Sequence, residues 1–120
     1  MSSKKVLVAM YKIVSEKSRI RDTANDRGAQ EQTITFSIAP MYTSGDEEDM
    51  SVRGVPVPDP DTGSYIINHG VVLDDMSNSC GLFCWVHYYP QSRQGIVVVY
   101  RYEPLESSDK TGFRYADLYE

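Results

Sequence analysis

The chain has two cysteines and two histidines, and one of the cysteines, Cys80, lies shortly downstream of His69 and Asp74. A thiol, an imidazole and a carboxylate are the groups that a cysteine hydrolase needs, and its base must come within about 3 Å of the sulfur. If the strands on either side of the Cys80 turn pair with each other, His69 lies about 13 Å along its strand from that turn. We therefore expect no catalytic site, and we keep these three residues as an alternative hypothesis.

The segment Asn78–Cys84, with the sequence NSCGLFC, resembles the Cys-Gly-x-Phe segment around the nucleophile of ubiquitin-like-protein proteases. The resemblance covers the residues between His69 and Phe83. It implies Cys80 as the nucleophile, with a histidine, an acidic residue and an amide upstream. In that family the cysteine opens a helix and the histidine lies much further upstream, whereas the residues after Cys80 here have the composition of a strand. The positions that would match the upstream groups are His69, Asp74 or Asp75, and Asn78.

Metal-ligand spacing does not favour a metal site. Cys80 and Cys84, with the two histidines, give a C-x3-C-x2-H spacing that structural zinc sites do not usually have. Asp59 and Asp61 alternate as in a calcium loop, but glycine stands where an EF-hand needs its last glutamate, so a tight turn explains the string. Two cysteines four apart on a strand lie about 13 Å apart, too far for a disulfide, which needs about 7 Å. We expect free thiols, no metal and no cofactor.

Two apolar runs, Leu82–Tyr89 and Ile96–Glu103, are predicted to form a central hairpin. If a six-residue loop sets the pairing, Tyr89 lies opposite Ile96, and the aromatic side chains share one face of the sheet. We expect this to be the core face. The alternative is an exposed platform that stacks a base, a sugar or apolar side chains of a partner. The binding candidates on this face are Trp85, His87, Tyr89, Tyr100 and Tyr102.

The net charge of −5 is divided unevenly along the chain. Residues 1–27 carry seven basic and three acidic side chains, whereas residues 28–75 carry one basic and nine acidic side chains. A basic arm and an acidic middle can pair within one chain or between chains. The charged binding candidates are Arg19, Arg21, Asp46, Glu47, Glu48 and Asp49.

Several short strands separated by turn signals predict an all-β, mainly antiparallel domain, a small β-sandwich or barrel of about six strands with long polar loops. The 120 residues suffice for one domain with one core. We expect a basic strand and loop over 1–31, a β core over 32–103 and a tail over 104–120. Residues 15–30 are expected to form a polar loop or to hide a short helix, and 113–119 a last edge strand or one helical turn. The expected strands are 5–14, 32–39, 52–57 (at a sheet edge because of its prolines), 64–73, 82–89 and 96–103.

These features predict a non-enzymatic protein-interaction module, either an assembly subunit or an inhibitor, that binds another protein or itself. Binding of single-stranded nucleic acid or a small ligand on the aromatic face is the second hypothesis, because the chain as a whole is acidic and nucleic-acid binders are usually basic. No run approaches the ~20 apolar residues of a membrane span, and the basic start is followed by too short an apolar run for a signal peptide. We expect a cytoplasmic or virion-enclosed protein, of viral or phage type.

Overall fold

The computed structural model describes residues 3–24, 28, 30–74 and 78–104, and for residues 20–24, 74 and 78–80 it describes the backbone only. Every element of this part is a β-strand. The predictions for residues 105–120 lie outside the described residues. The strands are β1 (Ser3–Ala24), β2 (Gln30–Pro40), β3 (Glu48–Gly54), β4 (Val57–Pro58), β5 (Tyr65–Asp74), β6 (Asn78–Tyr89) and β7 (Gln94–Pro104).

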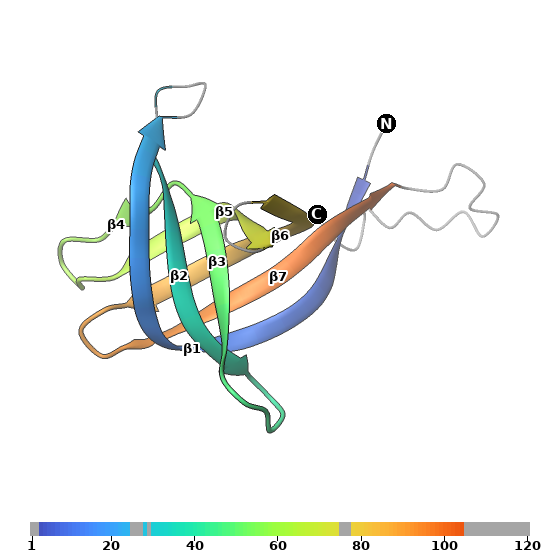
Figure 1. Cartoon of the computed structure of the whole chain (residues 1–120), viewed down its shortest axis with the longest axis horizontal. Coiled ribbons are helices and arrows are strands. Elements are labelled where there is room, and N and C mark those ends of the chain that lie inside the picture. The colour runs from blue at the N-terminus through green and yellow to red at the C-terminus, as the bar shows by residue number, and fades with distance from the viewer. Residues whose placement is uncertain (1–2, 25–27, 29, 75–77, 105–120) are drawn as a thin grey trace.

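The described strands form one antiparallel sheet that closes into a six-stranded barrel (Figure 1). Each barrel strand pairs with the next along the chain, β3 pairs with β5, and β7 returns to β1. The two-residue β4 lies outside the closed ring, beside β5. The prediction of a small all-β barrel is therefore confirmed, and the sandwich alternative is replaced by a single curved sheet.

β1 is a 22-residue strand that pairs with both β7 and β2. Its first half pairs with β7 as far as Ile13, and from Tyr11 onward it pairs with β2. Register shifts interrupt both ladders, and such bulges bend a strand and increase its twist. The expected loop or helix over 15–30 is therefore wrong for residues 15–24. Each bulge resets the two-residue alternation, which left this segment without a readable strand pattern.

The barrel interior is filled by apolar side chains from all six strands. Phe36 and Tyr88 meet edge to face at a ring-centroid distance of 5.4 Å, and Tyr65 meets Tyr88 at 5.5 Å. Aromatic pairs of this geometry add to the free energy gained by burial. The interior set is Ile13, Ile34, Phe36, Ile38, Val52, Tyr65, Ile67, Val72, Cys84, Val86, Tyr88, Val97 and Val99.

β2 has the clearest alternation of apolar and polar residues in the sequence, and its two faces explain that pattern. Ile34, Phe36 and Ile38 alternate into the interior and are fully buried. Thr35 and Ser37, on its other face, are also buried, and Thr35 shares a 2.8 Å hydrogen bond with Ser51 on β3. Thr35 and Ser37 thus have hydrogen-bond partners although they are buried.

Two predictions on segment boundaries need correction. The edge strand expected over 52–57 is divided: residues up to Gly54 belong to β3, which has strand neighbours on both sides, and only Val57–Pro58 lies at the end of the sheet order. The loop expected over 74–81 is replaced from Asn78 onward by the start of β6. The bulge expected at Gly70 is confirmed by a register shift between Ile67 and Gly70.

Candidate functional site

The β6–β7 hairpin carries the aromatic residues, and its register differs from the predicted one. Trp85 pairs with Val98 and Tyr89 with Gln94, so the loop has four residues and not six. Arg93 adopts a left-handed φ of 57°, which lets the chain turn early. A shift of two residues preserves the face of every side chain, so the predicted aromatic residues still share one side of the sheet.

This aromatic side is the outside of the barrel, so the expectation that it is the core face is wrong. The interior face of the hairpin carries Cys84, Val86 and Tyr88 of β6, with Val97 and Val99 of β7. Both faces are apolar in sequence, and period-two alternation cannot tell which of two apolar faces points inward. The interior of a six-stranded barrel is narrow, which favours the face with more small and β-branched side chains.

We define the aromatic face as the outward side of β5, β6, β7 and the first half of β1. Its rings are those of His69, Phe83, Trp85, His87, Tyr89, Tyr100 and Tyr102. The Nδ1 atom of His69 on β5 shares a 2.7 Å hydrogen bond with the hydroxyl of Tyr100. The His69 ring stacks on the ring of Phe83, with a centroid distance of 5.0 Å. Phe83 contacts Tyr102 at 5.4 Å. The rings continue along β6 as Trp85, His87 and Tyr89, with centroid distances of 5.8 and 4.8 Å between neighbours.

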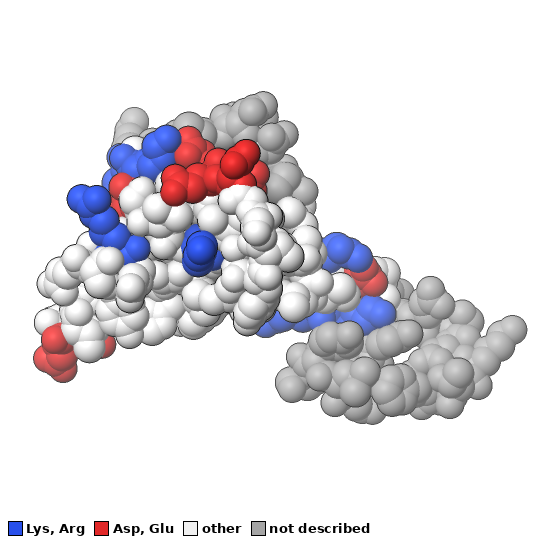
Figure 2. All heavy atoms as spheres, turned by 90° about the horizontal axis from the view of Figure 1, so that it is seen from below, with Lys and Arg blue, Asp and Glu red and all other residues white. Residues whose placement is uncertain are grey.

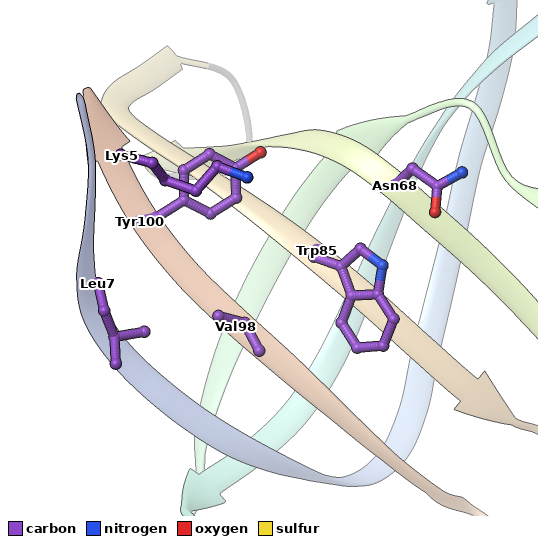
Figure 3. A pocket seen from close by; sticks show the side chains of 6 residues that line it. All are labelled: Lys5, Leu7, Asn68, Trp85, Val98 and Tyr100. Atoms are coloured by element: carbon purple, nitrogen blue, oxygen red, sulfur yellow. The ribbon is translucent and has the colours of Figure 1, made fainter. Parts of the chain in front are cut away.

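A hollow of about 350 Å³ opens within this face (Figure 3). Tyr100, although it points outward, is only 3% exposed and forms part of the lining. The Lys5 ammonium lies 4.6 Å from the centroid of the Tyr100 ring, a cation–π contact. Burial, with a smaller contribution from Tyr102, raises the pKa of Tyr100 to about 12. The hollow is lined by Lys5, Leu7, Asn68, Trp85, Val98 and Tyr100.

Four of these lining residues were not singled out from the sequence: Lys5, Leu7, Asn68 and Val98. A bulge between Leu7 and Ala9 places Leu7 opposite Tyr100 on the outside of the sheet, and a second bulge holds Asn68. Bulges re-aim side chains, so simple alternation could not assign Leu7 and Asn68 to a face, whereas alternation along β7 does place Val98 on the aromatic side. The glycine at position 70 was the only signal in the sequence that pointed to one of these irregularities.

The charge of the aromatic face differs from that of the whole chain. Lys5 and Lys12 project from the outward side of β1, where they lie opposite Tyr102 and Ile96. Among the described residues at outward positions of β5, β6, β7 and the first half of β1, the sequence has no aspartate or glutamate. This face is therefore apolar and weakly basic on a protein with a net charge of −5.

The predicted basic arm and acidic loop meet within the chain. Lys17 of β1 and Asp49 of β3 form a 2.9 Å ion pair across the outside of β2, and Ser37 donates a 3.2 Å hydrogen bond to Glu47. Figure 2 shows acidic and basic side chains gathered next to each other at this end of the molecule. Asp46 and Glu48 are exposed. At least part of the charge asymmetry is thus satisfied internally.

Arg19 also has partners within the chain. Its Nε lies 2.8 Å from the Glu16 carboxylate, and its guanidinium lies 5.0 Å from the ring centroid of Tyr65. The hydrogen bond with Glu16 raises the pKa of Arg19, and the Tyr65 hydroxyl donates a 2.9 Å hydrogen bond to the same carboxylate. These contacts tie β1 to β5. The side chain of Arg21 lies outside the described residues.

The structure describes the candidate thiol site only in part. Gly70 pairs with Cys84, so the backbone of His69 lies beside the middle of β6, several residues along that strand from Cys80. The ring of His69 is already engaged by Tyr100 and Phe83. The side chains of Cys80 and Asp74, and all of Asp75, lie outside the described residues.

Cys84 is a free, fully buried thiol whose pKa is raised to about 12 by burial. Only the thiolate reacts quickly with alkylating reagents, so we expect native Cys84 to remain unlabelled by iodoacetamide at neutral pH. Unfolding in guanidinium should make it fully reactive. Peptide mapping by mass spectrometry measures both states, and rapid labelling of Cys84 in the native protein would contradict its interior position.

Comparison with protein-family models, with curated proteins and with solved structures found no match to this chain. Among the described residues, no helix is long and apolar enough to cross a membrane.

Proposed function

We propose that this chain is a non-enzymatic protein-interaction module that binds a partner through the aromatic face. The observation that carries the proposal is the apolar hollow beside Trp85 and Tyr100 on the outside of a barrel. The interior is filled by a different set of side chains, so the outward rings are not needed to complete the core. Apolar surface gathered on the outside of a folded protein marks an interaction site.

The hollow has the form of a pocket for an anchoring side chain. Interface energy concentrates on a few aromatic or arginine anchors that fill desolvated pockets. Trp85 and Tyr100 offer ring surfaces, whereas Lys5 and Asn68 offer donors for the polar groups that accompany an anchor. A partner that inserts one aliphatic or aromatic side chain and places an acceptor near Lys5 suits this arrangement.

The manner of binding differs from addition of a strand to a sheet edge. In a closed barrel most edges are already paired, and the terminal strand β4 has two residues, one of them proline. The partner therefore contacts a sheet face. Both an assembly subunit and an inhibitor can bind in this way. Lys17 and Asp49 already pair within one chain, so these two side chains are not available for an ion pair between the basic arm of one copy and the acidic loop of another.

A photo-reactive phenylalanine analogue at position 7 or 102 tests the proposal in the cell. Leu7 and Tyr102 are 57% and 43% exposed on the aromatic face, whereas Tyr42 is 81% exposed in the β2–β3 loop and serves as the matched control. We expect discrete protein adducts from positions 7 and 102 and none from position 42. Equal adduct patterns from all three positions would count against a dedicated face.

Once a partner is isolated, Trp85→Ala should weaken its binding by about 2 kcal/mol or more, which is about 30-fold or more. Trp85 lies outside the core, so the variant is expected to keep its fold, which circular dichroism would check. Tyr42→Ala is the matched control and should leave the affinity unchanged. An unchanged affinity for Trp85→Ala would remove the hollow from the interface.

Binding of single-stranded nucleic acid is the second candidate, favoured by Lys5 and Lys12 on a face that combines basic groups with rings and whose described outward strand positions hold no aspartate or glutamate. Stacking of a base on an aromatic ring contributes about 1–3 kcal/mol. The same cross-linking experiment separates the candidates. Adducts that shrink on nuclease treatment would favour nucleic acid, and adducts that resist nuclease and yield to protease would favour a protein.

A further inference from the structure

The aromatic face leaves large apolar side chains in contact with solvent. Leu7, Val8, Tyr89 and Tyr102 are 57%, 41%, 37% and 43% exposed, and the hollow lies among the outward residues of the same strands. Exposed apolar surface of this kind is normally covered by a partner or by another part of the chain. The residues that line the hollow indicate the chemistry of the group that would bind there.

The hollow selects for an apolar group accompanied by negative charge. Its walls are mainly aromatic and aliphatic, and its one charged lining residue is Lys5. Lys12 adds a second positive charge on the same outward side of β1. An occupant with rings and a nearby carboxylate would bury its apolar part in the hollow and place its charge beside Lys5.

The chain itself contains a segment with this composition. Residues 113–120, with the sequence FRYADLYE, combine three aromatic residues with the acidic Asp117 and Glu120 and the basic Arg114, so their side chains carry a net charge of −1. The preceding residues 105–112, which we call the linker, are mostly polar and include a glycine. Residues 105–120 lie outside the part of the chain that the structure describes.

The linker is long enough to bring this segment to the hollow of the same molecule. β7 ends at Pro104, four residues beyond Tyr100, which is about 13 Å along the strand. Eight linker residues span up to about 28 Å when extended. A short covalent connection between two binding groups gives an effective concentration in the millimolar range, so even a weak contact is well populated.

We infer that residues 113–120 bind reversibly to the aromatic face of their own chain, with an aromatic side chain in the hollow and a carboxylate beside Lys5. The inference rests on the proposed function, because it takes the same surface to be a binding face. A foreign partner must then displace the segment, which makes the tail a competing ligand.

Trp85 is the only tryptophan of the chain and lines the hollow, so its fluorescence reports occupancy in the full-length protein. The test variant carries Phe113→Ser, Tyr115→Ser and Tyr119→Ser together. The control variant carries Ser107→Ala, Ser108→Ala and Thr111→Ala in the linker. We expect a red shift of Trp85 emission and a higher acrylamide quenching constant in the test variant, and no change in the control.

A peptide of residues 111–120, added to the test variant, should restore the blue-shifted emission, and the same peptide with the three serine substitutions should not. The signal of the unmodified protein should be independent of protein concentration, because the tail acts within its own molecule. Identical Trp85 emission and quenching in the test variant and the unmodified protein would overturn the inference. A signal that appears only at high protein concentration would overturn it in favour of a second copy as the occupant.

The cross-linking experiment at Leu7 distinguishes failure of this inference from failure of the proposed function. If the tail covers the face, the test variant gives a higher yield of partner adduct than the unmodified protein. Unchanged Trp85 fluorescence together with discrete adducts at position 7 would refute the tail as the occupant and leave the binding face in place. Unchanged fluorescence without adducts would refute both.

Discussion

Replacing Phe36 by alanine should destabilise the barrel by about 3–5 kcal/mol, the usual cost of removing a fully buried phenylalanine side chain. Phe36 is 0% exposed and packs edge to face on Tyr88 at 5.4 Å. The cavity cannot close easily, because the hydrogen-bonded strands around it hold their spacing. A domain of this size has about 5–15 kcal/mol of stability, so the substitution removes a large share of it.

Equilibrium unfolding in urea, followed by far-ultraviolet circular dichroism, measures this loss. Tyr42→Ala is the control, since Tyr42 is an aromatic residue with 81% of its surface exposed, and it should change the free energy of unfolding by less than about 0.5 kcal/mol. Similar losses for the two variants would show that Phe36 does not occupy the interior. If Phe36→Ala abolishes folding, the milder Ile38→Val should still cost about 0.5–1.5 kcal/mol.

The barrel should lose stability as the pH rises from about 10 to about 12. Burial raises the pKa of Tyr65, Tyr88 and Tyr100 above the ordinary value of 10.0, for Tyr100 to about 12. Between these pH values the unfolded chain has released its tyrosine protons while the folded chain still holds them. Because the unfolded state then binds fewer protons, the free energy of unfolding falls with rising pH. The contribution of these groups is complete below pH 10.

Urea midpoints at pH 8, 10, 11 and 12 measure this dependence. Tyr100→Phe should flatten part of it, because the variant has no proton to lose at that position. Tyr42→Phe, at a residue with 81% of its surface exposed, is the matched control and should reproduce the slope of the unmodified protein. A slope that is the same for Tyr100→Phe and the unmodified protein would contradict the buried, protonated state of Tyr100.

The strands that could be predicted are those with an undisturbed two-residue period or a strongly apolar run. β2 is the clearest case, since Ile34, Phe36 and Ile38 alternate without a bulge and all enter the interior. The second half of β1 could not be recognised, because its pairing with β2 shifts register after Ile13, Glu16 and Ile20. Closure between β3 and β5 depends on pairing across a turn-rich segment, which local pattern does not reveal.

The sequence predicts most of the aromatic residues of the candidate site, but not their placement or the other residues that line the hollow. Trp85, His87, Tyr89, Tyr100 and Tyr102 do share one side of the hairpin, as the sequence predicts. Their position outside the barrel follows from which side the sheet curves toward. That choice depends on the packing of all six strands together, and the two-sided apolar pattern of β6 and β7 carries no information about it.

The double role of β1 has a consequence for how the barrel forms. Lys5 pairs with Tyr102, so the ring closes only when nearly the whole chain has been brought back to its start. Contacts between residues so distant in sequence slow folding, because the entropy of loop closure is lost before the contact forms. During synthesis at about 5–20 residues per second, the first half of β1 must wait for several seconds before β7 leaves the ribosome. We expect the β5–β6–β7 meander to form first, and β7 to pair with the first half of β1 afterwards.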